Sequence, residues 1–91
     1  MRTLKRHKLF AKDLKRVRLT DNQFERMTRG ITTLLDGAPL PPEYLNHPLR
    51  GSEWEDCWEF HLGGDMLLIY LPAETDLILI RIGTHNDLFK K

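Results

Sequence analysis

The chain has 91 residues, of which 41% are hydrophobic and 30% charged, and its formal net charge is +1. A chain of this length can build one modest core, so we expect a single domain over residues 1–91. It has no apolar run long enough to span a bilayer and no apolar N-terminal signal segment, which argues against an integral membrane protein. The lone cysteine, Cys57, fits a partly buried side chain in a reducing compartment. We therefore expect a cytoplasmic protein without a membrane partner.

Positive charge is concentrated near the N-terminus. Residues 1–18 contain eight lysines and arginines and one acid, Asp13, whereas residues 19–91 contain six bases and twelve acids. This asymmetry favours a polyanionic partner, either nucleic acid or an acidic protein segment. A solvated helix face, balanced by the acidic remainder of the fold, explains the same charges without a partner.

The first expected elements are a short strand and a basic helix. Residues 2–6 are few and polar, and they allow a short edge strand. From His7 onward, apolar side chains recur at the i, i+4 and i+7 spacing of one helix face, while lysines and arginines occupy other positions. This apolar face consists of Phe10, Leu14 and Val17. The pattern predicts an amphipathic helix with a basic exposed face.

A second helix is expected to begin after Thr20. Thr20 and Gln23 have the spacing of a capping box, in which each side chain binds the backbone N–H of the other residue. The apolar face that follows consists of Phe24, Met27, Ile31 and Leu34. Asp36 and Gly37 supply a stop signal. The prolines of residues 38–42 then make a stiff connector, because they cannot continue a helix.

The second half of the chain has the patterns of strands. Residues 54–61 mix aromatic side chains with acids, which is typical of a partly exposed strand. Continuous apolar runs at residues 66–71 and 77–82, separated by a five-residue turn, predict two central antiparallel strands. A short helical turn is expected at residues 86–89. The order predicts an α+β fold in which two N-terminal helices pack on a small antiparallel β-sheet.

Ionisable side chains gather at the strand ends and loops of this second half. His47 lies in the loop before the first strand, and His61 ends that strand. Asp65 begins the next strand, and His85 follows the last one. Histidine titrates near neutral pH, so one imidazole can accept a proton while another donates one. Acid–base chemistry is therefore one candidate activity, and RNA cleavage through attack of the 2′-hydroxyl needs such a pair.

A metal centre is the competing interpretation of the same residues. The three histidines and the aspartate are separated by 14, 4 and 20 residues, which matches no compact zinc pattern, and the chain has no cysteine pair. We therefore expect no metal and no cofactor in this site.

Arg81 is a candidate for stabilising negative charge on a phosphate. In an extended strand, positions 81, 83 and 85 lie on one face, which would point Arg81 towards the same cleft as His85. Gly83 is expected to let the backbone turn before His85. An ion pair with an acid of the chain is the alternative role for Arg81.

Three segments together carry a family resemblance. They read NHPLRGSEWEDC, HLGGDMLLIY and RIGTHNDLF, in this order. They resemble the YafQ branch of the RelE-type bacterial toxins over residues 44–89, whereas the helical first half matches in layout only. The resemblance implies a compact, microbial-ribonuclease-like α+β fold. It also implies a ribosome-dependent, metal-independent endonuclease of messenger RNA that a cognate antitoxin holds inactive.

The resemblance assigns the candidate site residues to roles. His47, His61, Asp65 and His85 match the family's catalytic cluster, with His85 as the general acid. The general base would be either Asp65 or His61, a choice that the sequence leaves open.

Two more positions match substrate-binding residues of the family. Arg81 matches an arginine that would steady the phosphate. Phe89 matches a terminal aromatic residue that would stack on a nucleotide, or would instead close the C-terminal turn onto the sheet.

One position departs from the family pattern. Trp58 stands where many relatives have a basic residue; it cannot donate charge to a phosphate, although it would be able to stack on a base. The departure favours a second hypothesis, a catalytically weak or inactive module that acts through antitoxin or nucleic-acid binding. In either case the basic first helix would contact ribosomal RNA or an acidic antitoxin segment.

Overall fold

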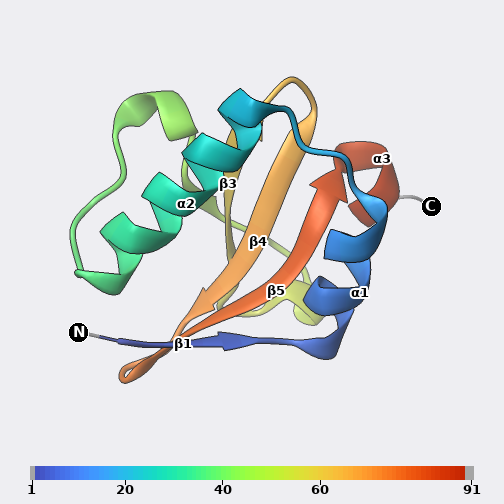
Figure 1. Ribbon diagram of the computed structural model, residues 1–91. Helices are drawn as coiled ribbons and strands as arrows, with labels where there is room; N and C mark the ends of the chain where they lie inside the picture. The colour runs from blue at the N-terminus through green and yellow to red at the C-terminus, as the bar shows by residue number, and fades with distance from the viewer. Residues whose placement is uncertain (1, 90–91) are drawn as a thin grey trace.

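A five-stranded sheet with two helices packed on one of its faces forms the body of the structure (Figure 1). The computed structural model describes residues 2–89. In chain order the elements are β1 (Thr3–Arg6), α1 (Lys8–Arg16), α2 (Asp21–Leu35), the 3-10 helix η1 (Pro42–Tyr44), β2 (His47–Pro48), the 3-10 helix η2 (Ser52–Trp54), β3 (Trp58–Gly63), β4 (Met66–Pro72), β5 (Asp76–Thr84) and α3 (His85–Leu88). This order confirms the expected α+β fold with two N-terminal helices. Among these residues no helix combines the length and the apolar character needed to cross a membrane.

The sheet is mixed rather than antiparallel throughout, which corrects one detail of the expected fold. The strand order is β1-β5-β4-β3-β2. All neighbours pair antiparallel except β1, which runs parallel to β5. The physical reason is the connection between the paired strands. Short turns force antiparallel pairing, whereas β1 and β5 are separated by most of the chain, which leaves a parallel pair possible.

Helix α2 begins at the expected cap but buries a different face. Thr20 and Gln23 form both bonds of the capping box, at 3.0 and 3.1 Å. Phe24, expected in the core, is 56% exposed. The buried side of α2 is centred on Met27 and Gly30, and at about 100° per residue Phe24 is turned some 60° from Met27, towards solvent. A Cβ on Gly30 would lie 2.7 Å from Phe60, so the helix packs tightly against β3 there.

Strand β3 starts later than its sequence pattern indicates. Trp54 ends η2, and the chain then turns through Asp56, whose φ of 65° is left-handed. The regular strand begins only at Trp58. Two of the acids that interrupt the apolar pattern, at positions 55 and 56, therefore belong to a turn and not to the strand.

Both faces of the sheet are covered. The larger core lies between the sheet and the helices α1 and α2, and it includes Phe10, Met27, Leu34, Phe60, Tyr70 and Ile82. The smaller core, on the opposite face, consists of Cys57, Leu67, Ile69 and Leu88 and is flanked by partly buried Trp54 and Phe89. We call the sheet face that carries the smaller core the site face.

A β-bulge in β5 determines which residues lie on the site face. Ile69 of β4 pairs with Arg81, whereas the next residue, Tyr70, pairs with Leu79, so Ile80 has no direct partner. The extra residue shifts the alternation of side chains along β5. Leu79 and Ile82 consequently both belong to the larger core. Arg81 lies opposite Ile69, a residue of the smaller core.

Candidate active site

Two neighbouring cross-strand rows bring the ionisable residues onto the site face. Glu59 of β3 lies in one row with Ile69 and Arg81. His61 lies in the next row, which ends at Gly83. Because directly opposite residues on paired strands point to the same face, Glu59, His61 and Arg81 project from one surface.

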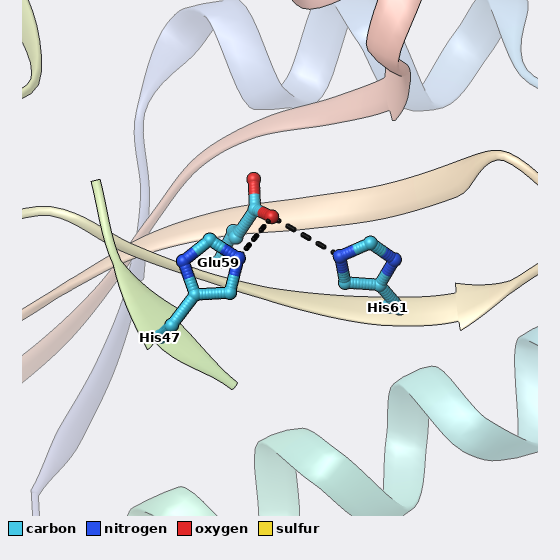
Figure 2. A group of neighbouring side chains, drawn as sticks. All are labelled: His47, Glu59 and His61. Carbon is cyan, nitrogen blue, oxygen red and sulfur yellow. Dashed lines mark hydrogen bonds and ion pairs between the residues drawn. The ribbon is translucent and has the colours of Figure 1, made fainter. Parts of the chain in front are cut away.

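Glu59 is the centre of the first half of the site (Figure 2). It is 3% exposed, and its Oε2 atom lies 2.8 Å from Nε2 of His47 and 3.1 Å from Nε2 of His61. The pairing of β2 with β3 puts His47 directly opposite Glu59, and strand alternation puts His61 two residues further along the same face. A single buried carboxylate oxygen therefore holds two imidazoles.

Glu59 is a site residue that was not predicted from the sequence. The available signal was its i, i+2 spacing to His61 on an expected strand, which places both side chains on one face. The second partner, His47, depends on the pairing of a two-residue strand that no local pattern reveals.

The second half of the site joins His85 to Asp65. Nδ1 of His85 lies 2.8 Å from Oδ1 of Asp65, and both side chains are exposed, at 46% and 60%. His85 is the first residue of α3, and Thr84 and Asp87 cap that helix with two reciprocal bonds. The His85 ring centroid lies 5.5 Å from that of His61, which in turn lies 6.3 Å from that of His47. The structure thus brings together the four residues predicted as catalytic, with the three imidazoles in a row.

Gly83 allows close packing of α3 on β5 and does not form the turn that was expected before His85. It lies inside β5, and its φ is not left-handed. A Cβ at this position would come within 3.3 Å of both Asp87 and Leu88 of α3. The missing side chain therefore lets α3 lie directly on the strand, and Leu88 anchors that helix in the smaller core. These contacts fix where His85 is presented.

Arg81 makes an ion pair with an acid, the role that the sequence left as the alternative. Its Nε and Nη2 atoms lie 2.6 and 3.1 Å from the two carboxylate oxygens of Asp13 in α1. Burial by itself would raise the pKa of Asp13. The hydrogen bonds from Arg81 and from the Ile82 N–H, together with the positive charge of Arg81, outweigh burial, so the pKa is lowered. Binding of a phosphate by Arg81 stays a prediction.

Phe89 packs against Trp54 at the edge of the site. Their ring centroids are 5.6 Å apart in an edge-to-face arrangement, and Phe89 lies 5.9 Å from His85. Both aromatic side chains are partly buried against the smaller core. This contact matches the structural role considered for Phe89, and its stacking on a nucleotide stays a prediction.

Trp58 points away from the site. It pairs with Tyr70, and it packs against the larger core on the opposite face of the sheet. The expectation that it could stack on a substrate base is therefore wrong. The absence of a basic residue at this position removes no charge from the site face.

One hydrogen bond ties down the loop residue before His47. The Tyr70 hydroxyl donates a 2.6 Å hydrogen bond to Oδ1 of Asn46, the residue before His47. Burial raises the pKa of Tyr70 to about 12, so this hydroxyl remains protonated and able to donate throughout the neutral pH range.

The first half of the site also has the donor set of a metal centre. One ligand atom from each of His47, Glu59 and His61 lies within 4.8 Å of the others. Two imidazoles and a carboxylate suit a transition metal such as zinc. This is the one such group of three found among residues 2–89.

Comparisons with known proteins agree with this fold and place the chain in a family. A family model described as the bacterial toxin of the type II toxin–antitoxin system, YafQ, matches residues 2–90. The mRNA interferase toxin YafQ of Escherichia coli K12 is 33% identical over 81 residues, which cover 88% of this chain and 87% of that protein.

Solved structures give the same result. A copper-bound mutant toxin from Helicobacter pylori is 34% identical with a TM-score of 0.86, covering 98% of this chain and 100% of that one. YafQ in the E. coli DinJ–YafQ complex is 33% identical with a TM-score of 0.84, covering 98% and 99%. The family match spans nearly the whole chain, and the chain therefore belongs to the YafQ family of bacterial type II toxin–antitoxin toxins.

Proposed function

We propose that this toxin is a ribosome-dependent endoribonuclease that cleaves messenger RNA by acid–base chemistry without a metal ion. The observation that carries the proposal is the pair of histidine–carboxylate groups on one face: Glu59 with His47 and His61, and Asp65 with His85. The name of the E. coli relative, mRNA interferase, supports the same substrate. The family match over residues 2–90 supports one toxin domain over residues 1–91.

The general base is assigned to the Glu59–His61 pair. Asp65 and His61 were the two candidates, but Asp65 already accepts the bond at Nδ1 of His85, so it acts as the residue that orients the acid. The buried Glu59 carboxylate orients His61 in the corresponding way. The pair removes the proton of the 2′-hydroxyl, and the 2′-oxygen then attacks the neighbouring phosphorus.

His85 completes the reaction as the general acid. With Nδ1–H bound to Asp65, a proton on Nε2 is available for the 5′-oxygen that leaves as the P–O bond breaks. The products are a 2′,3′-cyclic phosphate and a free 5′-hydroxyl. Arg81 contributes positive charge to the phosphorane, and Phe89, beside His85, stacks on or positions a nucleotide.

The basic face of α1 is assigned to the macromolecular partners. Its exposed bases are Lys8, Lys12, Lys15 and Arg16. In the free toxin these side chains would contact ribosomal RNA phosphates, with the salt dependence that such contacts carry. In the inactive complex they would bind an acidic segment of a cognate antitoxin, in line with the solved DinJ–YafQ complex of the E. coli relative. Both partners are consistent with a cytoplasmic protein.

The metal-binding donor set is proposed to inhibit rather than to catalyse. A transition metal held by Glu59 and by Nε2 of both histidines would leave the one proton of neutral His61 on Nδ1, the nitrogen that has to accept the substrate proton. Copper bound to the Helicobacter pylori toxin is compatible with either role. Cleavage should therefore survive a chelator and should fall when zinc is added. Loss of cleavage with the chelator, restored by zinc, would instead make the metal a cofactor.

The decisive test measures cleavage of a defined messenger RNA by the purified toxin, with and without ribosomes. The wild type should cut only with ribosomes, and His85→Ala should not cut. His7→Asn is the matched control, because His7 caps α1 far along the chain from the site and Asn also caps helices. This control should cut as fast as the wild type.

The second hypothesis, a catalytically inactive binding module, predicts a different pattern. Wild type and His85→Ala would then arrest translation equally, with no cut RNA and equal affinity for the antitoxin. Trp58 packs against the larger core on the opposite face of the sheet, so its identity no longer favours this hypothesis.

A further inference from the structure

Asp13 is an unusual residue for its position in the chain. It is the one acid among residues 1–18, which hold eight bases, yet its side chain is 3% exposed. A buried carboxylate is costly unless it is paired and hydrogen-bonded. Its partners should therefore explain why it is there.

The partners of Asp13 come mainly from β5, the strand that leads to His85. Oδ2 accepts bonds from Nε of Arg81 at 2.6 Å and from the backbone N–H of Ile82 at 3.1 Å. Oδ1 accepts a bond from Nη2 of Arg81 at 3.1 Å. Arg16 adds a fourth bond at 3.1 Å, but its side chain is 74% exposed, so it contributes least.

Strand β1 does not extend along β5 as far as Ile82, and the Asp13 side chain binds the backbone of β5 there. The pairing of β1 with β5 ends at Arg6 and Leu79, so the Ile82 N–H lies beyond the neighbouring strand. Helix α1 crosses beside this part of β5 (Figure 1), and the Asp13 carboxylate accepts the bond that a further strand residue would have accepted. One side chain of α1 thus binds both a backbone N–H and an arginine side chain of β5.

Asp13 binds the guanidinium of Arg81 along one side, so the edge formed by Nη1 and Nη2 is not the one that faces Asp13. A guanidinium can be bound from the side, through Nε and one Nη, or from the end, through both Nη atoms. Asp13 takes the side formed by Nε and Nη2, and neither bond uses Nη1. The end edge is the one that can form two parallel bonds to the oxygens of a phosphate.

We propose that Asp13 is a positioning residue for RNA cleavage: it grips Arg81 from the side and so aims the end edge of the guanidinium at the scissile phosphate. The inference builds on the proposed function, in which Arg81 stabilises the phosphorane. Asp13 itself touches no substrate. Its effect passes through Arg81, which distinguishes it from a residue that only attaches α1 to the sheet.

The test is a double-mutant cycle on cleavage at the ribosome, using Asp13→Asn and Arg81→Ala. Asparagine keeps the shape of Asp13 but loses the charge that grips Arg81. Asp13→Asn should lower kcat on the order of 10-fold or more with little change in KM, since a small misplacement of a catalytic group is costly. In the Arg81→Ala background the same substitution should have no further effect on kcat.

Glu25→Gln is the matched control, because it makes the same acid-to-amide change in an exposed ion pair, Glu25 with Arg29 on α2, and leaves the bonds between Asp13 and Arg81 in place. It should keep the wild-type kcat. An unchanged kcat in Asp13→Asn, or an equal loss with and without Arg81, would overturn the inference. If the wild type cuts RNA and His85→Ala does not, such a result contradicts the role of Asp13 and leaves the proposed function standing.

Arg81→Lys tests the same idea if Asp13→Asn does not fold. Lysine keeps the positive charge but cannot form the two-bond side grip. It should lose as much kcat as Arg81→Ala while binding the antitoxin with unchanged affinity. A wild-type kcat in Arg81→Lys would show that charge alone is sufficient and would overturn the positioning role.

Discussion

The two halves of the candidate site differ in how firmly the fold holds them. Glu59 is buried between two strands, and the sheet supplies both of its histidine partners. Asp65 and His85 are exposed, and His85 begins a helix of four residues. A helix of one turn is not stable on its own, so its position depends on packing. The sheet itself therefore fixes the proposed base, whereas the position of the proposed acid depends on the few contacts that hold α3 on β5.

This difference has a consequence for substrate binding. The buried half has its geometry before the RNA arrives, because Glu59 is held among β2, β3 and β4. The exposed half can be approached by a large substrate such as messenger RNA on a ribosome. The acid is accessible from solvent, and the base is fixed in the sheet. This arrangement suits cleavage of a bond in a macromolecule better than cleavage of a small ligand in a closed cavity.

The largest expected effect is at the buried half. Glu59→Gln keeps the size of the side chain but removes the charge that orients both imidazoles. We expect cleavage to fall by roughly 100-fold or more, the range typical of general acid–base catalysis. The measurement is single-turnover cleavage on programmed ribosomes, with thermal melting to confirm the fold.

Asp65→Asn is the comparison for this prediction. It should cost less than Glu59→Gln, because Asp65 is exposed and orients one imidazole, whereas Glu59 is buried and orients two. The reverse order, with Asp65→Asn inactive and Glu59→Gln close to wild type, would make Asp65 the base and would invert the comparison of the two halves.

A smaller effect on cleavage is expected from Gly83→Ala, which acts on the exposed half. The new Cβ would meet Asp87 and Leu88 at 3.3 Å, so α3, with His85, would have to shift slightly away from the strand. We expect roughly a 10-fold loss of cleavage and a loss of about 1–3 kcal/mol in the free energy of unfolding. Cleavage rates and urea unfolding of the same preparation measure both quantities.

Gly30→Ala separates these two losses. Its Cβ would lie 2.7 Å from Phe60, in the core on the other face of the sheet. It should therefore lower stability at least as much as Gly83→Ala but leave the kcat of the folded protein unchanged. Equal losses of kcat in the two variants would show that overpacking in general, and not the displacement of α3, impairs cleavage.

The sequence predicts the exposed half of the site better than the buried half. His85 follows an apolar strand and precedes the expected helical turn at residues 86–89, so the sequence pattern alone locates it at the end of the sheet. Glu59 was missed because an acid within a strand usually reads as solvent-facing. Its burial depends on β2, a strand of two residues whose pairing is a tertiary property.

The remaining differences have the same origin in tertiary packing. Phe24 fits the apolar period of α2, but the close approach of the helix at Gly30 turns the buried face away from it. Trp58 was expected to be able to stack on a base, yet alternation along β3 directs it to the opposite face of the sheet from Glu59. The pairing register of β3 and the packing of α2 decide these two orientations, and both depend on tertiary structure.

The smallest expected effect concerns stability as a function of pH and again contrasts a buried carboxylate with an exposed one. The pKa of Asp13 in the folded protein is lowered below its ordinary value of 3.8. Its contribution to stability is therefore fully present above that value and is lost as the pH falls through the folded pKa. Asp13→Asn should cost roughly 1.5–3 kcal/mol at pH 7, the usual range for hydrogen bonds to a charged group. The cost should shrink below about pH 4.

Urea unfolding of wild type and variant at pH 7 and pH 3 measures this difference, since titrations common to both proteins cancel. Asp65→Asn is the exposed counterpart, and it should change stability little at either pH because exposed ion pairs contribute little. A cost of Asp13→Asn that stays the same at pH 3 would mean that the carboxylate's charge does not hold α1 to β5. The Ile82 N–H bond, which an asparagine oxygen can also accept, would then be the main attachment, and the two carboxylates would differ in burial but not in electrostatic role.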